Sequence, residues 1–147
     1  MRKARAKKRP LLPDPRFNDT LVTRFVNNLM LDGKKSIAFN IFYDAIDIVS
    51  EKSEGNGLET WKEALNNVMP HVEVRSRRVG GANFQIPMQV RPDRKVTLGM
   101  KWMILATRKR NERSMAQKLA AEILAASKEE GAAVKKRTEV HRMAEAN

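Results

Sequence analysis

The sequence predicts a mostly α-helical protein: a bundle of about six helices with one protruding β-hairpin and a disordered basic N-terminal arm. Three observations lead to this prediction. Apolar residues recur at spacings of three and four over most of the chain, the period of a helix with one buried face. Residues 72–90 instead alternate apolar and polar side chains on both sides of a Gly-Gly pair, which is typical of a hairpin. Six of the first nine residues are Lys or Arg, and a segment so poor in apolar surface does not fold alone.

The chain divides into an extended basic arm, residues 1–17, and a single helical domain, residues 18–147. The arm contains Pro10, Pro13 and Pro15, which hold the residues before them in extended conformations. A chain of 147 residues is long enough to bury one core but not two.

The first two predicted helices follow the arm. Asn18 or Asp19 is a suitable N-cap for the first, and Gly33 is a suitable stop. Ser36 is expected to cap the second helix. The helical spacing predicts these buried positions: Leu21, Val22, Phe25, Val26, Leu29 and Met30 in the first helix, and Ile37, Ile41, Phe42, Ala45, Ile46, Ile48 and Val49 in the second.

A third helix, with Leu58 and Trp61 on its buried side, should follow the Gly-rich linker at 55–57 and end before Pro70. The hairpin comes next, with Gly80-Gly81 as its turn. Pro87 is acceptable there because a two-stranded ribbon consists only of edge strands. The base of the hairpin is expected to pack on the helical body through the apolar side chains Val72, Val74, Met88 and Val90.

Three further helices are expected after the hairpin. Pro92 suits the first turn of the fourth, which runs to the basic stretch 108–110. Ser114 is a good N-cap for the fifth, which closes near Gly131. The last segment has good helix formers but a thin apolar stripe. We therefore expect it either to pack loosely on the rest of the protein or to bind a partner molecule.

The net charge of +12 is unevenly distributed. Residues 1–35 carry ten basic and three acidic groups, residues 36–73 two and seven, residues 74–118 twelve and two, and residues 119–147 five of each. An acidic block between two strongly basic ones indicates one face toward a polyanion and one face toward solvent. This pattern is the electrostatic signature of a nucleic-acid-binding protein.

The sequence disfavours several other classes of protein. The chain has no cysteine, which excludes disulfides, thiolate catalysis and Cys-based zinc sites. No apolar run approaches the ~20 residues of a membrane span, and the basic N-terminus is not followed by the apolar core of a secretory signal. We therefore expect a cytoplasmic protein with no cofactor, no bound metal and no membrane partner. The two histidines, His71 and His141, could in principle support ribonuclease chemistry, but they lie seventy residues apart in the sequence.

Two basic clusters are candidate RNA contacts. Arginine side chains near the hairpin turn, at 75, 77 and 78, and the cations after the return strand, at 91, 94 and 95, suit phosphate geometry. The second cluster spans the fourth and fifth helices, from Lys101 to Lys118. Trp102 lies within it and either stacks on a base or belongs to the core, and a lone tryptophan on an apolar helix favours the core. Gly80-Gly81 is not a nucleotide-binding loop, because no helix N-terminus follows it.

Four stretches resemble, in order and spacing, segments of the bacterial-type family of small-subunit ribosomal protein seven: LLPDPRFND, NLMLDGKKSIA, VEVRSRRVGGANFQIPMQVRPDRK and AVKKRTEVHRMAEAN. The resemblance runs from about Leu11 to Asn147. It implies a bundle of six helices with one protruding hairpin and a basic N-terminal arm, in agreement with the elements predicted above. It also implies a structural rRNA-binding protein of the small ribosomal subunit, with no catalytic residue.

The family resemblance implies binding to the 3′ major domain of small-subunit rRNA, nucleation of head assembly, and a location near the tRNA exit site and the mRNA path. The implied rRNA contacts are Arg2, Lys3, Arg5, Lys7, Lys8, Arg9, Lys34, Lys35, Arg75, Arg77, Arg78, Arg91, Arg94, Lys95, Arg108, Lys109, Arg110, Arg113 and Met115. The hairpin tip, Gly80, Gly81, Ala82 and Asn83, is expected near tRNA and mRNA. The C-terminal helix is expected to contact neighbouring proteins of the head and platform.

Two alternatives belong to other classes. A nucleoid architectural protein also uses basic β-arms, but it inserts an apolar wedge at the arm tip, whereas the tip here is Gly-Gly-Ala-Asn. Competition between duplex DNA and structured RNA distinguishes the two. A ribonuclease would be excluded if the purified protein leaves RNA intact and His71→Ala and His141→Ala change nothing.

Overall fold

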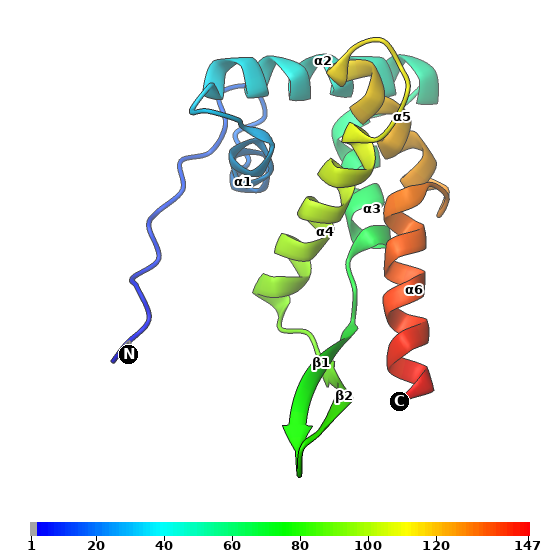
Figure 1. Ribbon diagram of the computed structural model, residues 1–147. Coiled ribbons are helices and arrows are strands. Elements are labelled where there is room, and N and C mark those ends of the chain that lie inside the picture. Colours follow the sequence, from blue (N-terminus) through cyan, green and yellow to red (C-terminus); the bar gives the residue numbers. More distant parts are fainter. Residues whose placement is uncertain (1–2) are drawn as a thin grey trace.

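The computed structural model describes residues 3–147, and within them the chain forms six helices and one two-stranded antiparallel sheet (Figure 1). The elements are α1 (Thr20–Leu29), α2 (Lys35–Ser53), α3 (Gly57–Val68), β1 (Val72–Val79), β2 (Ala82–Gln89), α4 (Pro92–Arg108), α5 (Met115–Ser127) and α6 (Ala132–Ala146). The predicted fold class and element order are confirmed. Within the described residues, no helix is long and apolar enough to cross a membrane.

The core forms where α2, α3 and α5 pack against one another, with α1, α4 and α6 around them. Phe25, Phe42 and Trp61 lie at its centre, with ring centroids 5.0 to 5.6 Å apart and no exposed surface. The α4 helix approaches α3 closely at Gly99, where an added Cβ would lie 2.8 Å from the side chain of Met69. The period of 3.6 thus identified the buried face of most helices.

A buried aspartate fixes the root of the N-terminal arm. The Asp14 carboxylate is only 2% exposed and accepts hydrogen bonds from the backbone N–H groups of Arg16, Phe17 and Asp19 and from the Tyr43 hydroxyl, at 2.8 to 3.1 Å. These bonds join the arm to the start of α1 and to the middle of α2. We call this set of contacts the Asp14 anchor. Residues 5–13 before it have no regular secondary structure and run away from the bundle in Figure 1.

The helix ends agree in part with the sequence signals. Asp19 caps α1 by accepting from Leu21 N, and Ser114 caps α5 in a reciprocal capping box with Gln117. The expectation that Ser36 caps α2 is wrong, because that helix begins at Lys35 and its N-cap, Lys34, makes no side-chain cap bond. Gly33 lies in the turn after α1, with φ +71°, rather than at the helix end.

The hairpin turn pairs Val79 with Ala82, and this register determines the two faces of the ribbon. Gly80 and Gly81 have φ of +58° and +83°, which suits a two-residue hairpin turn. Because directly paired residues share a face, the even-numbered residues of β1 lie on the same face as the odd-numbered residues of β2. The apolar alternation of the two strands therefore falls on opposite faces.

Two predicted core positions are wrong. Met88 was expected to pack on the body with Val90, but it lies on the face opposite Val72 and is 45% exposed, whereas Val90 is buried. Ile37 was expected in the core and is 53% exposed, because it lies outside the buried stripe of α2, which is formed by Ala38, Phe42, Ala45, Ile46 and Val49. The hairpin beyond its base contributes little to the core, as predicted.

Candidate nucleic-acid interface

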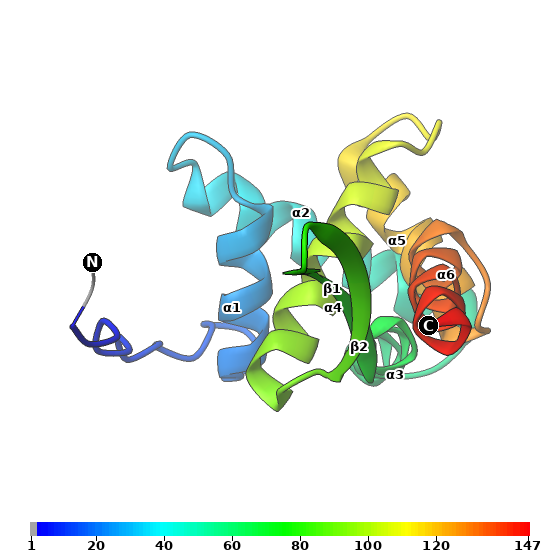
Figure 2. The ribbon, with the colours of Figure 1, turned by 60° about the horizontal axis from the view of Figure 1, so that its bottom comes forward.

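The arm, α1, the base of the hairpin and α4 lie near one another on one side of the bundle, and most of the predicted RNA-binding residues lie on these elements (Figures 1 and 2). The acidic helix α2 lies at the end of the bundle away from the hairpin in Figure 1, with Asp44, Asp47 and Glu51 exposed. The basic and acidic blocks of the sequence are therefore largely separated in space as well. Arg2 lies outside the described residues.

The arm meets the start of α4. Lys8 forms an ion pair with Asp93 at 2.8 Å, in which both side chains are largely exposed, and this lysine lowers the pKa of the Asp93 carboxyl. Arg5 lines a hollow of about 270 Å³ whose other walls include Arg75, Arg91 and Arg94. The structure therefore gathers cations from β1 and the start of α4 with Arg5 of the arm, which precedes them by at least seventy residues in the sequence.

One face of the hairpin combines arginine with exposed apolar side chains. Arg75 pairs with Ile86 and Arg77 pairs with Phe84, so these four side chains lie on one face. Phe84 is 52% exposed. Arg78 lies on the other face. None of the three arginines forms an ion pair with another residue of 3–147, so their guanidinium groups are available for phosphate.

Arg94 is engaged by a carboxylate within the protein. Its Nε and Nη2 donate to the two carboxylate oxygens of Glu73 at 2.7 and 3.1 Å, a two-point contact. This contact lowers the pKa of Glu73 and raises that of Arg94. It joins the first turn of α4 to β1 and sets the angle at which the hairpin leaves the body.

The far end of α4 lies near the α1–α2 loop. Arg108 Nη2 donates to the backbone carbonyl of Leu29 at 3.4 Å. Lys34 ends that loop and Lys35 begins α2; both are exposed, and the Lys35 ammonium lies 5.9 Å from the centre of the Phe39 ring. The α1–α2 and α4–α5 loops both extend toward the top of Figure 2, so two separate basic segments are presented in a similar direction.

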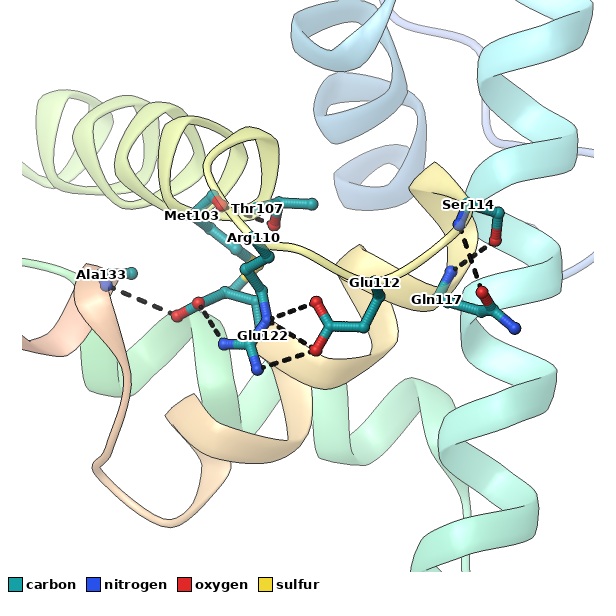
Figure 3. Close-up of polar contacts among 8 residues, drawn as sticks. All are labelled: Met103, Thr107, Arg110, Glu112, Ser114, Gln117, Glu122 and Ala133. Atoms are coloured by element: carbon teal, nitrogen blue, oxygen red, sulfur yellow. Dashed lines mark hydrogen bonds and ion pairs between the residues drawn. The ribbon is translucent and has the colours of Figure 1, made fainter.

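Arg110 is held inside the α4–α5 connection (Figure 3). Its guanidinium donates to Glu112 at 3.1 Å and, through Nη1, to Glu122 at 3.1 Å. The Glu122 side chain is completely buried, and burial raises its pKa even though Arg110 acts in the opposite direction. Arg113 is exposed between this cluster and the Ser114 cap. The cluster therefore fixes the loop that presents Lys109 and Arg113 to solvent.

The two histidines, which the sequence separates, meet in the structure. The backbone N–H of His71 donates to His141 Nε2 at 3.1 Å, and the rings stack with centroids 5.9 Å apart. Burial lowers the pKa of His141, and the nearby charge of Arg137 acts in the same direction. Because the Nε2 lone pair is used in this bond, the contact joins α6 to the base of the hairpin and does not supply a general base. No spacing rule could have predicted it.

The structure also places at this surface a basic residue that was not among the predicted contacts. Arg24, on α1, donates through Nη2 to the backbone carbonyl of Asp93 at 3.0 Å and to the Thr97 hydroxyl at 2.7 Å. Arg24 lies in a helix that was predicted from the spacing of its apolar residues. Apart from its charge, nothing in the sequence indicates that it has a role. The contact aligns α1 with the start of α4, beneath the arm. The surface as a whole can bind a polyanion through several separate elements.

Comparison with known proteins agrees with this geometry. A family model described as "Ribosomal protein S7p/S5e" matches residues 1–147. The chain is 74% identical to the small ribosomal subunit protein uS7 of Flavobacterium psychrophilum and 75% identical to that of Christiangramia forsetii, each over all of this chain and 95% of the relative. It is 53% identical to uS7 of a Clostridium botulinum strain over 99% of this chain and 94% of that protein. The chain belongs to the ribosomal protein S7p/S5e family, in its bacterial form.

Proposed function

We propose that this protein organises the 3′ major domain of the small-subunit rRNA, nucleates assembly of the head, and extends its hairpin tip toward exit-site tRNA and mRNA. Family membership already establishes a structural, non-enzymatic protein of the small ribosomal subunit in the cytoplasm, and it implies rRNA binding. The proposal adds which part of the rRNA is bound, and by which residues.

We assign phosphate contact to most of the predicted cations and an internal role to two of them. The first group comprises the arm residues from Arg2 to Arg9 and Lys34, Lys35, Arg75, Arg77, Arg78, Arg91, Lys95, Arg108, Lys109 and Arg113, with Met115 beside them. Arg94 and Arg110 are already engaged by Glu73, Glu112 and Glu122. Their role in this proposal is to hold the hairpin and the α4–α5 loop in place.

One observation carries the proposal about the tip. The hairpin extends beyond the bundle, and from Arg75 to Gln85 every residue is exposed. Such a segment contributes little to folding, so its arginine content points to a function at its far end. The arginines anchor the ribbon to rRNA, and Gly80, Gly81, Ala82 and Asn83 lie toward tRNA and mRNA. The neighbouring proteins of the head and platform contact α6.

The test is to shorten the tip by removing Val79–Phe84. In the observed register this leaves the Ser76–Gln85 pair, and a Gly-Gly pair inserted between Arg78 and Gln85 gives a four-residue loop, because a two-residue Arg-Arg turn would need positive φ. The melting temperature should stay nearly unchanged, because no buried side chain is lost, and the protein should still enter subunits. Exit-site tRNA retention or reading-frame accuracy should change.

A matched control keeps the tip length. Gly80→Asn gives an Asn-Gly turn, which tolerates the same positive φ values, and it should behave like the wild type. The tip proposal is wrong if the shortened protein unfolds. It is equally wrong if ribosomes carrying the shortened protein hold tRNA normally and translate with unaltered accuracy.

A further inference from the structure

A groove between the end of α4 and the start of α6 has features that the surface described above does not explain. It has a volume of about 350 Å³ and is lined by Trp102, Leu105, Ala106 and Lys109 on one side and by Ala132, Lys135, Lys136 and Glu139 on the other. We call it the α4–α6 groove. Of its residues, only Lys109 is among the rRNA contacts that the family resemblance implies.

Apolar side chains form the floor of the groove. Trp102 is partly buried and packs against the core with part of its surface. Leu105 follows within the same helix and is 52% exposed. A single exposed leucine needs no explanation, but here it adjoins an indole ring in a hollow. The floor therefore offers a flat apolar surface to a ligand.

Cations dominate the rim. Lys109, Lys135 and Lys136 line the groove with one carboxylate, Glu139. None of the three lysines forms an ion pair with another residue of 3–147. The rim is therefore suited to an anion and the floor to a flat apolar group.

We infer that the α4–α6 groove receives an unstacked nucleotide of the rRNA, with its base against Trp102 and Leu105 and its phosphates at the lysines. This inference rests on the proposed binding of rRNA. A nucleotide combines a planar apolar base with an adjacent negative charge, and sequence-specific RNA recognition commonly stacks splayed bases on aromatic side chains. An extended peptide fits less well, because the walls are helices whose backbone groups bond internally and offer no strand edge.

Fluorescence provides a direct test, since the chain has two tryptophans and the other, Trp61, is completely buried. The probe is a single-stranded uridine dodecamer, compared with an abasic ribose-phosphate chain of the same length. The uridine strand should quench Trp102 emission and protect it from acrylamide, while the Trp61 signal serves as an internal reference. The abasic strand should bind the cations without quenching.

Variants then measure the contribution to binding of a 3′ major domain rRNA fragment. Leu105→Gln alters an exposed side chain, so the fold should be retained. Affinity should fall about three- to tenfold, the loss expected when half a leucine side chain no longer leaves water. Trp102→Phe should bind more tightly than Trp102→Leu, with a total loss for the latter of about 5- to 100-fold. Met143→Gln, at a 41% exposed position outside the groove, is the matched control and should bind normally.

Salt dependence separates the base from the phosphate contribution. Leu105→Gln should leave the log–log salt slope unchanged, because no charge is removed. The double variant Lys135→Gln/Lys136→Gln should flatten it by about 1.4 to 1.8.

The inference is overturned if the uridine strand leaves Trp102 emission unchanged and Leu105→Gln binds the rRNA fragment like the wild type. If the wild type still binds that fragment with a steep salt slope, the proposed function survives this failure. If the wild type does not bind it, the proposed function itself fails. A Leu105→Gln protein that binds RNA normally but loses a neighbouring protein in the subunit also overturns the inference, in favour of a protein occupant.

Discussion

Removing the Arg110 side chain should destabilise the protein far more than removing the charge of its partner. Arg110→Ala leaves the Glu122 carboxylate completely buried with one weak donor, the backbone N–H of Ala133 at 3.4 Å (Figure 3). Breaking a buried ion pair from one side costs about 3–5 kcal/mol. For a chain of this length, 3 kcal/mol corresponds to a decrease of about 6–12 °C in melting temperature.

Glu122→Gln is the matched variant, because it keeps the shape of the side chain and still accepts a bond from Arg110. It should cost about 1 kcal/mol or less. The double variant Arg110→Ala/Glu122→Gln should be more stable than Arg110→Ala alone, since no buried charge remains without a partner.

The pH dependence has a definite sign. Burial raises the pKa of Glu122 above its unfolded value, so its favourable contribution is complete below the unfolded pKa and is lost as pH rises through the folded pKa. Arg110→Ala raises that folded pKa further, so the variant should recover stability relative to the wild type between pH 7 and pH 5. Urea unfolding at both pH values measures this. If Arg110→Ala melts within about 1 °C of the wild type, the ion pair does not stabilise the fold.

Four further outcomes are expected. Deleting residues 1–9 should flatten the log–log salt slope of rRNA binding by about four to five units, since six arm cations are removed; an unchanged slope would make the arm a passive tail. Amide exchange in the free protein should be fast from Lys3 to Arg9, and strong protection there would contradict an arm that orders only on RNA. Arg94→Ala should weaken rRNA binding through hairpin position, so its salt slope should match the wild type while that of Arg75→Ala flattens by about 0.7–0.9. Burial lowers the pKa of His141, assisted by Arg137 and His71 and opposed by Glu145; the unfolded chain therefore takes up this proton first, and thermal stability should fall below pH ~6.5 in the wild type but not in His141→Asn.

Local sequence signals, such as N-cap residues and the Gly-Gly turn, were enough to predict the helices and the hairpin. Asp19 and Ser114 act as caps because an N-cap depends only on a side chain and the next three backbone N–H groups. The Gly-Gly turn was equally local. Met88 was misplaced because each strand was considered by itself, and the face of a strand residue depends on its partner across the turn.

The sequence predicted which residues of the candidate site are cationic, but not which of those cations are engaged by carboxylates within the protein. Arg94 and Arg110 look like their neighbours in the sequence, and what distinguishes them is a carboxylate 21 or 12 positions away. The bond between His71 and His141 spans seventy residues. Such contacts are set by how the helices pack, which the pattern of one segment does not contain. The groove beside Trp102 was missed for the same reason, since its two walls come from different helices.

The Asp14 anchor has a consequence for binding kinetics. Because the root of the arm is bonded to α1 and α2, Lys3 can explore only a region within about 36–40 Å of a fixed point, the extended length of the chain between Lys3 and Asp14. Once the hairpin is bound to RNA, the arm searches as a tethered ligand, at an effective concentration on the order of millimolar. Asp14→Asn would weaken the anchor while leaving every cation of the arm in place. The second step of binding would then slow, although the charge of the arm is unchanged.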